Sequence, residues 1–343
     1  MRFPWVNLAL FFLLGIQVIT GYLGLVNGRS QRAWILWFHG IGAYALIFLF
    51  YWKSQIVWET WRRKRRWTGT RQSFVLMLGL LILVLVSGLV WSFVGPIYLG
   101  GFSLISIHMY LAVLLIPLLG WHVWRMRFVW RLPAAKNRRL FTGTAVSLLA
   151  GLLLWQNGRW LRQWTHLSGA SRRFTGSYET GSNTGLFPVV SWIADNPPPV
   201  NTTQWQLIIT GAVTHPLHLT YDQLLPLADE QMTATLDCTG GWYTTQTWRG
   251  VRLSRLLQMA GLTENALSIT VRSVTGYQRR FTVAEGMGYL LATHVAERPL
   301  THGHGFPLRL VAPDQRGVNW VKWVQEIQIN QTSKIWQLPL PLQ

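Results

Sequence analysis

Residues Ser73–Val94 read SFVLMLGLLILVLVSGLVWSFV, a run of 22 residues without a charged side chain. A helix needs about 20 such residues to cross the hydrocarbon core of a bilayer. Three other stretches have a similar length: Trp5–Val26, Ala33–Trp52 and Ser103–Trp124. A fifth stretch, Phe141–Trp155, is shorter and richer in Gly, Thr and Ser. The sequence therefore predicts an all-α transmembrane helical bundle of five spans over residues 1–157.

Basic residues are concentrated in the same part of the chain. Residues 1–165 carry eighteen Lys and Arg but a single acid, Glu59, whereas residues 166–343 carry thirteen against eleven. The basic residues lie between the apolar stretches and not on one face of a soluble domain. We therefore attribute the positive charge to membrane topology, and we expect contact with membrane lipid and none with nucleic acid.

The loops predict the orientation of the spans. Segment Lys53–Arg71 carries seven basic residues and segment Arg125–Arg139 carries six, and cytoplasmic loops hold the excess of Lys and Arg. This rule puts the N-terminus and both loops in the cytoplasm. Five spans then deliver the C-terminal half to the extracytoplasmic side of the plasma membrane. In addition, Asn137–Phe141 (NRRLF), which opens the fifth stretch, resembles a twin-arginine export signal inside the chain.

Two intramembrane histidines lie at matching depths. His39 is six residues from the outer end of its span and His108 is five from the outer end of another, which puts both about 8–9 Å below the outer boundary. Imidazoles on two helices can bind a haem iron from both faces, and Gly40, Gly42 and Ala43 leave room for a porphyrin edge. The arrangement resembles membrane b-type cytochromes, which implies haem b. Hydrogen bonding between helices is the alternative.

A third intramembrane histidine, His122, lies fourteen residues past His108 and so about 21 Å deeper on nearly the same face. Two-haem cytochromes use such a pair, but the position fourteen past His39 is Lys53. A second haem would need an unusual second ligand, such as Met77. His122 could instead line a quinone site or have no chemical role, and the sequence leaves the three alternatives open.

The C-terminal half has the pattern of a mixed α and β domain. Residues 158–185 are predicted to be a linker, residues 186–330 a domain and residues 331–343 a tail. Helical patterns occur at Leu253–Ala260 and after a capping box formed by Thr282 and Glu285. Strand-like runs alternate with these helices irregularly, which indicates α+β: Trp205–Gly211, Met232–Cys238, Ser268–Val274, Pro307–Ala312 and Val324–Ile329.

The single cysteine, Cys238, closes one of these runs and precedes Gly240 and Gly241. A strand that ends in a Gly-Gly turn places a thiol where backbone approaches a ligand closely. A thiolate is a soft ligand for a transition metal, although an isolated cysteine is more often an inert core residue.

Two sequence blocks give this cysteine a context. The first is Cys238–Trp242 (CTGGW) with Trp248–Val251 (WRGV); the second is His304–Val311 (HGFPLRLV) with Gly317–Val324 (GVNWVKWV). In this order they resemble the two signatures of the sulfite-oxidase-type molybdopterin domain, and the resemblance covers about residues 186–330.

The resemblance implies that Cys238 is the protein's catalytic ligand to molybdenum. His304, Arg309 and Lys322 would hold the pterin and its phosphate, which suits a guanidinium and an ammonium group. Cofactor contacts are also expected from Trp242, from backbone at Gly317 and Val321, and from an N-terminal loop containing Asn183 and Phe187. One departure is Thr275, which stands before Gly276-Tyr277 where relatives often carry an acid.

The resemblance further implies oxygen-atom transfer on a small substrate, with electrons exchanged with quinone or quinol through haem b. The first hypothesis is a reductase of a sulfoxide-like substrate. The second is a sulfite-type dehydrogenase that feeds quinone, for which Arg249, Arg279 and Arg280 offer positive charge. The third is an anchored cofactor-binding module without haem or turnover. The sequence gives neither the direction of electron flow nor the oligomeric state.

Overall fold

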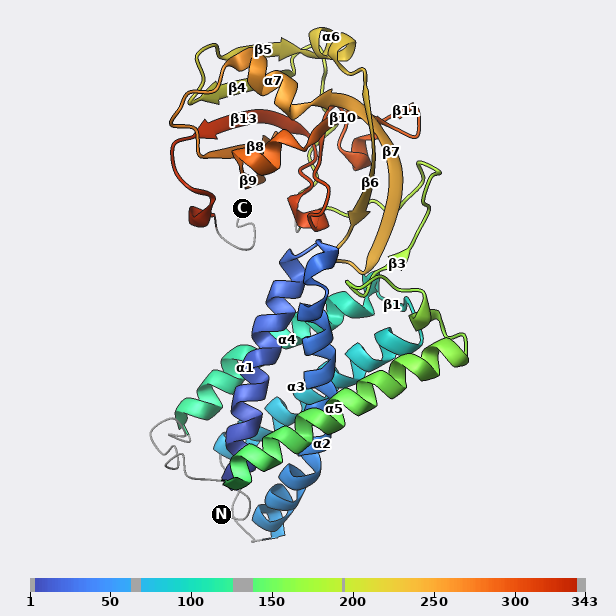
Figure 1. Cartoon of the computed structure of the whole chain (residues 1–343), viewed down its shortest axis with the longest axis vertical. Coiled ribbons are helices and arrows are strands. Elements are labelled where there is room, and N and C mark those ends of the chain that lie inside the picture. Colours follow the sequence, from blue (N-terminus) through green and yellow to red (C-terminus); the bar gives the residue numbers. More distant parts are fainter. Residues whose placement is uncertain (1–3, 63–68, 126–137, 193–194, 338–343) are drawn as a thin grey trace. The chain divides into compact units, whose positions relative to one another are not determined.

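The computed structural model describes residues 4–62, 69–125, 138–192 and 195–337 (Figure 1). The chain divides into two compact units. The helical unit comprises Met1–Leu25 and Ser30–Tyr178, and the α+β unit comprises Val26–Arg29 and Glu179–Gln343. Residues 63–68 of the first expected basic loop and 126–137 of the second, which include Asn137 of the expected export signal, lie outside the described residues.

The helical unit contains five long helices: α1 (Pro4–Val26), α2 (Trp34–Arg62), α3 (Gly69–Phe93), α4 (Leu104–Arg125) and α5 (Arg138–Trp164). A short hairpin of β1 (Tyr98–Leu99) and β2 (Phe102–Ser103) joins α3 to α4. Among the described residues, four helices are long and apolar enough to cross a membrane, and these contain the four longer predicted stretches.

The predicted fifth span is corrected by the structure. Helix α5 forms and is longer than expected, but it is not among the four candidate spans. The reason is the polar composition of its C-terminal half, which includes Gln156, Asn157, Arg159 and Arg162. Good helix-forming residues extend the helix there while lowering its mean hydropathy.

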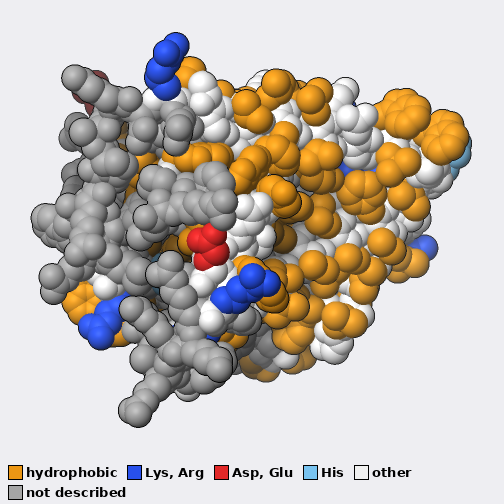
Figure 2. All heavy atoms as spheres, turned by 90° about the horizontal axis from the view of Figure 1, so that it is seen from below, with side chains coloured by type: hydrophobic (Ala, Val, Ile, Leu, Met, Phe, Trp, Pro, Cys, Tyr) orange, Lys and Arg blue, Asp and Glu red, His pale blue; other side chains and the backbone are white. Residues whose placement is uncertain are grey.

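Small residues let the helices of this unit approach closely. A Cβ added at Gly151 of α5 would lie 2.6 Å from the Ile41 carbonyl oxygen of α2, and one at Gly40 would lie 2.8 Å from the Trp155 indole nitrogen. Such contacts are typical of membrane helix packing. Exposed Leu, Ile, Val, Phe and Trp side chains cover much of the outer surface of these helices (Figure 2).

Residues expected to be a linker are ordered in the structure. Helix α5 continues to Trp164, and the following chain packs on α3. The Trp91 indole donates a hydrogen bond to the Gly176 carbonyl (2.8 Å), and the Tyr178 hydroxyl donates to the Trp91 carbonyl (2.6 Å). A composition rich in Ser and Gly indicated a tether, but these two aromatic anchors hold the segment in place.

The α+β unit is built on two sheets. The first has the order β11–β10–β7–β3, with β12 pairing with β10 and β6 with β7. Its strands are β3 (Tyr178–Glu179), β6 (Glu230–Asp237), β7 (Trp242–Arg252), β10 (Leu290–Val295), β11 (Arg298–Pro299) and β12 (Arg309–Val311).

The second sheet has the order β5–β4–β13–β8–β9, in which β13 is parallel to β4 and antiparallel to β8. All five predicted strands are confirmed, and with them the α+β class. The long strand β7 was missed, because its residues were interpreted only as a motif. The strands of this sheet are β4 (Gln206–Gly211), β5 (Leu217–Thr220), β8 (Ser268–Ser273), β9 (Gln278–Thr282) and β13 (Val324–Asn330).

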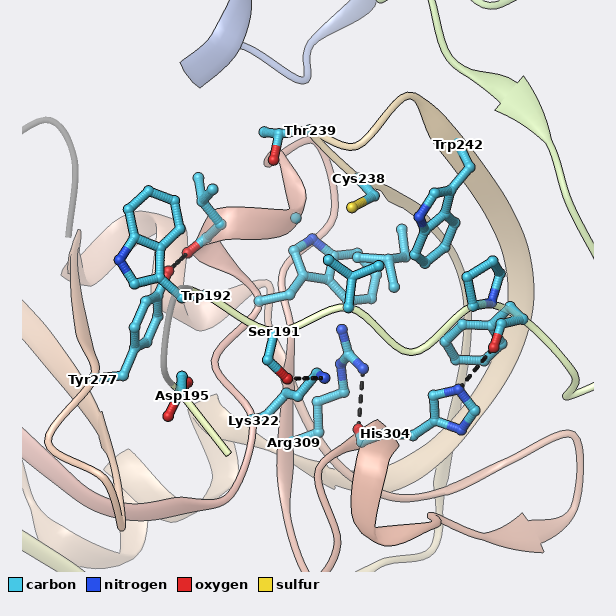
Figure 3. A pocket seen from close by; sticks show the side chains of 17 residues that line it. Ser191, Trp192, Asp195, Cys238, Thr239, Trp242, Tyr277, His304, Arg309 and Lys322 are labelled. Atoms are coloured by element: carbon cyan, nitrogen blue, oxygen red, sulfur yellow. Dashed lines mark hydrogen bonds between the residues drawn. The ribbon is translucent and has the colours of Figure 1, made fainter. Parts of the chain in front are cut away.

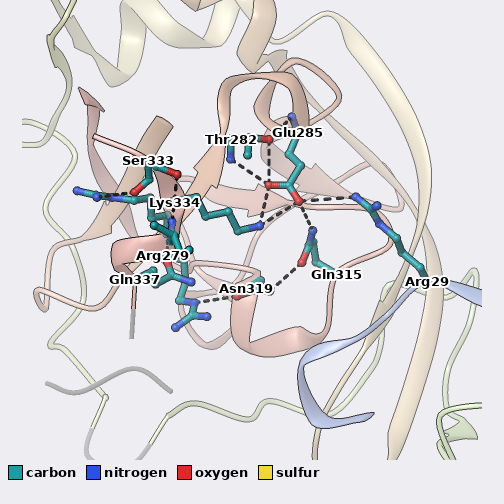
Figure 4. Close-up of polar contacts among 11 residues, drawn as sticks. Arg29, Arg279, Thr282, Glu285, Gln315, Asn319, Ser333, Lys334 and Gln337 are labelled. Carbon is teal, nitrogen blue, oxygen red and sulfur yellow. Dashed lines mark hydrogen bonds and ion pairs between the residues drawn. The ribbon is translucent and has the colours of Figure 1, made fainter. Parts of the chain in front are cut away.

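Short helices complete this unit: α6 (Tyr221–Leu224), α7 (Leu253–Ala260) and α8 (Val283–Met287). The apolar positions of α7 recur at helical spacing and are fully buried, which docks the helix on the core. The predicted capping box at α8 is confirmed, since Thr282 and Glu285 bond reciprocally. Glu285 also accepts from Lys334 (2.7 Å), so part of the expected tail packs on the domain (Figure 4).

Candidate functional site

The α+β unit contains a pocket whose wall carries both apolar and charged side chains (Figure 3). Seven of the nine residues predicted for this domain line it: Cys238, His304, Arg309, Gly317, Lys322, Phe187 and Trp242. Val321 and Asn183 are not among the lining residues: Val321 is fully buried in the core, and Asn183 is exposed on a turn with a positive φ of 62°.

Cys238 lies at the rim where β6 ends and turns back into β7. Its backbone N–H donates to the Trp242 carbonyl (2.9 Å), and its Sγ accepts from the Gly240 N–H (3.3 Å). Gly241 takes a positive φ of 89° in this turn, which glycine adopts without strain. Burial raises the pKa of the Cys238 thiol, opposed by the Gly240 N–H and the charge of Arg316. A cation bound at the sulfur would reverse this balance and favour the thiolate.

Arg309, on β12, supplies a buried positive charge. Its Nη1 donates to the His304 carbonyl (3.0 Å), and its guanidinium lies 5.6 and 5.8 Å from the ring centroids of Trp248 and Trp320. Its Nε has no hydrogen-bond partner among the residues that the structure describes. Burial lowers the pKa of Arg309 to about 10. An unpartnered guanidinium nitrogen beside a cavity is suited to an anionic ligand.

Lys322 supplies a second charge and comes from the loop before β13. Its ammonium donates to the Gly303 carbonyl (2.7 Å) and to the Ser191 hydroxyl (3.1 Å). Burial, reinforced by the charge of Arg309, lowers the pKa of Lys322 from 10.5 to about 7. The two adjacent cations make each other's burial more costly. A bound phosphate would offset that cost for both, because its negative charge attracts each of them.

His304 differs from expectation in how it contributes. Its Nε2 is 3.0 Å from the Phe187 carbonyl oxygen and its Nδ1 is 3.0 Å from the Thr301 hydroxyl, while its ring stacks on Phe187 with centroids 4.0 Å apart. Burial lowers the pKa of this imidazole. With both nitrogens engaged by the protein, His304 holds the loop that carries Phe187 against the cavity.

Several residues at the cavity were not predicted. Arg316 and Asp237 form a buried ion pair (2.6 Å) behind the cysteine, and Arg316 also donates to the Cys238 carbonyl (3.2 Å). Asp195 is 7% exposed and its Oδ1 has no partner among the described residues. Arg316 directly precedes Gly317–Val324, the second part of the second sequence signature, which was the available signal. Asp195 follows a loop without a recognisable pattern.

The expected positive charges for a sulfite-like substrate do not converge on the cavity. Arg249 pairs with Glu297 (3.8 Å), Arg279 donates to Asn319 (2.7 Å), and Arg280 contacts Thr270 (3.2 Å). None of the three arginines is among the lining residues.

The helical unit brings His39 and His108 together, with ring centroids 6.3 Å apart and ring planes 80° apart. The Nδ1 of His39 lies 3.1 Å from the Thr20 hydroxyl, and the Nδ1 of His108 lies 2.8 Å from the Val84 carbonyl oxygen. Metal-binding histidines commonly have one ring nitrogen fixed in this way, which orients the other nitrogen toward the metal.

A glycine lies against each of these rings. A Cβ added at Gly21 or at Gly88 would lie 3.1 Å from Cε1 of His39 or His108, respectively. His122 does not join the pair; its ring packs on Phe74 with centroids 5.7 Å apart. No other histidine occurs in residues 1–165. Among the described residues there is no group of three or more His, Cys, Asp or Glu side chains able to hold a metal ion.

Comparison with known proteins identifies the α+β unit. Residues 194–335 match the family described as the oxidoreductase molybdopterin binding domain. The chain is 30% identical over 148 residues to the uncharacterized oxidoreductase YuiH of Bacillus subtilis, covering 42% of this chain and 74% of that protein. The chain therefore belongs to the molybdopterin-binding oxidoreductases, of the sulfite oxidase type, with four apolar helices before the cofactor domain.

Two other proteins are similar over part of this chain. The chain is 28% identical over 184 residues to the NADH nitrate reductase of Volvox carteri, which covers 43% of this chain and 20% of that enzyme. The sulfane dehydrogenase SoxCD of Paracoccus pantotrophus is 27% identical over 39% of this chain and 40% of that chain, with a TM-score of 0.38. This chain thus spans about a fifth of the matched nitrate reductase and under half of the dehydrogenase chain.

Proposed function

We propose that this protein is a membrane-bound molybdenum oxidoreductase that transfers an oxygen atom to or from a small substrate outside the cytoplasm. It exchanges electrons with the quinone pool through an intramembrane haem b. The observation that carries the proposal is the cavity, which combines a buried thiol at Cys238 with two buried cations, Arg309 and Lys322.

The donor set fits a molybdopterin. Molybdenum in such a centre supplies two-electron oxygen-atom transfer, and the protein positions both the metal and the substrate. Cys238 would ligate the metal through its thiolate, held by the turn to Trp242 and by the Arg316–Asp237 pair. Arg309 and Lys322 would bind the anionic groups of the pterin, since charge-assisted hydrogen bonds are the strongest available to a phosphate.

The electron path rests on the histidine pair. The rings of His39 and His108, whose centroids lie 6.3 Å apart, would hold one haem iron between them. Fixing each Nδ1 by a helix hydroxyl or carbonyl leaves each Nε2 for the iron. Gly21 and Gly88 provide the space that the rings occupy.

The lining favours reduction of a neutral, sulfoxide-like substrate over oxidation of sulfite. Beyond the two cations assigned to the cofactor, the described lining residues include apolar side chains such as Trp192 and Val190 and the carboxylate of Asp195, but no further Lys or Arg. A doubly charged oxyanion would require further cationic groups, and Arg249, Arg279 and Arg280 engage other partners. A dehydrogenase that feeds quinone is the second candidate, and it has the same redox centres.

The topology belongs to the same proposal. The paired Arg138 and Arg139 at the start of α5 resemble a twin-arginine signal, which would carry the folded cofactor domain to the extracytoplasmic side. His122, away from the histidine pair, is a candidate contact for the quinone.

A reduced-minus-oxidised visible spectrum of the detergent-purified protein tests the electron path. A b-type signal of one haem, lost in His39→Ala and in His108→Ala, is the expected result. Oxidation of the reduced haem by methionine sulfoxide would identify a reductase, and reduction of the haem by sulfite would identify the dehydrogenase. A protein that contains molybdenum but no haem would leave the helices as an anchor and refute the proposed path.

A further inference from the structure

Two arginines of the helical unit lie close together without a carboxylate of that unit beside them. Arg162 lies near the end of α5 and Arg172 in the loop that follows. Arg162 is only 4% exposed. Both guanidiniums lie within electrostatic range of the hydroxyls of Tyr44 and Tyr178, and Arg172 also lies within range of Arg162.

The surroundings of Arg162 are closely packed. Its guanidinium lies over the Phe93 ring, 4.8 Å from the centroid. A Cβ added at Gly158 would lie 3.0 Å from the Tyr44 hydroxyl and 3.7 Å from Arg162 Nη1, and one at Gly169 would lie 2.9 Å from the Arg162 side chain. Two glycines therefore make the space that the arginine occupies, so the side chain is held and not free to reach solvent.

Arg172 faces the same region from the other side. Its Nη1 donates to the Ser92 hydroxyl at the end of α3 (2.8 Å). Burial and the charge of Arg162 lower the pKa of Arg172 to about 10. The two arginines thus interact with hydroxyls and an aromatic ring, and they repel each other.

No carboxylate in this unit can balance the two charges. The only acid in residues 1–178 is Glu59. It lies fifteen residues beyond Tyr44 on α2, which is about 22 Å along the helix. The carboxyl end of α5 offers roughly half a negative charge, which cannot neutralise two guanidiniums. Buried charges without a partner are strongly destabilising, and the helical unit itself supplies no carboxylate near these two arginines, which favours a bound anion.

We propose that Arg162 and Arg172 form an oxyanion-binding site, and that its ligand is a carboxylate or phosphate group of a bound molecule. Two sources have this chemistry. One is the pair of haem carboxylates, a reading that rests on the proposed function; the other is the phosphate of a membrane phospholipid.

The position favours the haem carboxylates. Tyr44 is five residues from His39 on α2, and Ser92 is five residues from Ser87, whose hydroxyl lies 3.2 Å from the Nδ1 of His108. Each interval corresponds to about 7.5 Å of helix, which is of the order of the reach from the centre of a porphyrin to the carboxylates at its rim.

The experiment uses the full-length protein in mild detergent and compares Arg162→Gln, Arg172→Gln and Arg162→Lys. The matched control is Arg159→Gln, because Arg159 is exposed, lies one turn earlier on α5 and stacks on Trp155. Haem per chain is measured by absorbance, phospholipid per chain by native mass spectrometry, and stability by thermal unfolding.

If the haem carboxylates are bound, each Gln variant loses haem affinity by about tenfold or more, as for a hydrogen bond between charged groups. Arg162→Lys and the Arg159 control then retain haem. If a phospholipid is bound, the Gln variants keep haem and lose one bound lipid. Both results support the site and distinguish its ligand.

The proposal is overturned if the Gln variants keep haem and lipid and unfold at an unchanged or higher temperature. That is the behaviour of an uncompensated buried charge whose removal relieves repulsion. A wild-type protein without haem would contradict the proposed function separately, and the lipid measurement alone would then decide the anion site.

Discussion

Replacing Lys322 by Met separates a cofactor-binding role from a structural one, because the two roles predict opposite changes in stability. Lys322 is 9% exposed, and burial beside Arg309 lowers its pKa from 10.5 to about 7. That depression corresponds to about 5 kcal/mol at most. Met has a similar volume, but it forfeits the hydrogen bonds to Gly303 and Ser191, each worth about 1 kcal/mol. Cofactor-free Lys322→Met should therefore be about 2–3 kcal/mol more stable than wild type at pH 7.

The pH dependence has a defined sign. Between pH 7 and 10.5 the unfolded chain holds a proton that the folded, cofactor-free domain has lost at Lys322. The free energy of unfolding therefore rises with pH across this window. In Lys322→Met this rise should largely disappear. In the presence of the cofactor the wild type should be more stable than Lys322→Met. The phosphate would stabilise the charged form of Lys322, and the variant would retain less cofactor.

The assay is thermal unfolding, followed by tryptophan fluorescence, of cofactor-free and cofactor-loaded protein at pH 7 and pH 10, with molybdenum per chain measured in parallel. Lys334→Met is the matched control, because Lys334 pairs with Glu285 outside the cavity. A cofactor-free Lys322→Met that is less stable than wild type at pH 7 and keeps the pH-dependent rise would refute the reasoning.

Three further predictions follow from the two sites. Gly88→Ala puts a methyl group 3.1 Å from His108 and should lower haem content, whereas Gly79→Ala, on the same helix with no atom within 4 Å of the added methyl group, should leave the spectrum unchanged; equal spectra would contradict the packing argument. Arg316→Ala removes the cation that pairs with the buried Asp237 carboxylate and should destabilise the α+β unit by about 3–5 kcal/mol in thermal unfolding; a loss below 1 kcal/mol would contradict this. Asp195→Asn should lower molybdenum retention without changing haem content, because its buried carboxylate faces the cofactor cavity; unchanged retention would assign it no cofactor contact.

The sequence predicted those features that are local in the chain. Cys238, Arg309 and Lys322 belong to short blocks whose residue types and order are specific, and the cavity contains all three. The four long spans follow from uninterrupted apolar runs, and the capping box at Thr282 from its spacing. The equal depths of His39 and His108 predicted that they would meet, because depth is additive along regular helices.

Features that depend on distant contacts could not be predicted. Asp195 precedes Cys238 by 43 residues and only the fold brings it to the cavity wall. Gly21 and Gly88 are ordinary helix residues until the opposing histidines are placed. The segment before Tyr178 has a linker composition, yet two aromatic hydrogen bonds fix it on α3. The apolar pattern predicted that the helix ends at Trp155, whereas α5 continues through polar residues to Trp164.

The most direct test of the account is the molybdenum and haem content of the matured wild-type protein, Cys238→Ser and His108→Ala, measured on the same preparations. The account predicts one molybdenum and one haem per chain in the wild type. Cys238→Ser should lose catalysis and hold molybdenum weakly while keeping haem, and His108→Ala should lose haem while keeping molybdenum. A wild-type protein without molybdenum, or a Cys238→Ser variant with full molybdenum and full activity, would contradict the central claim.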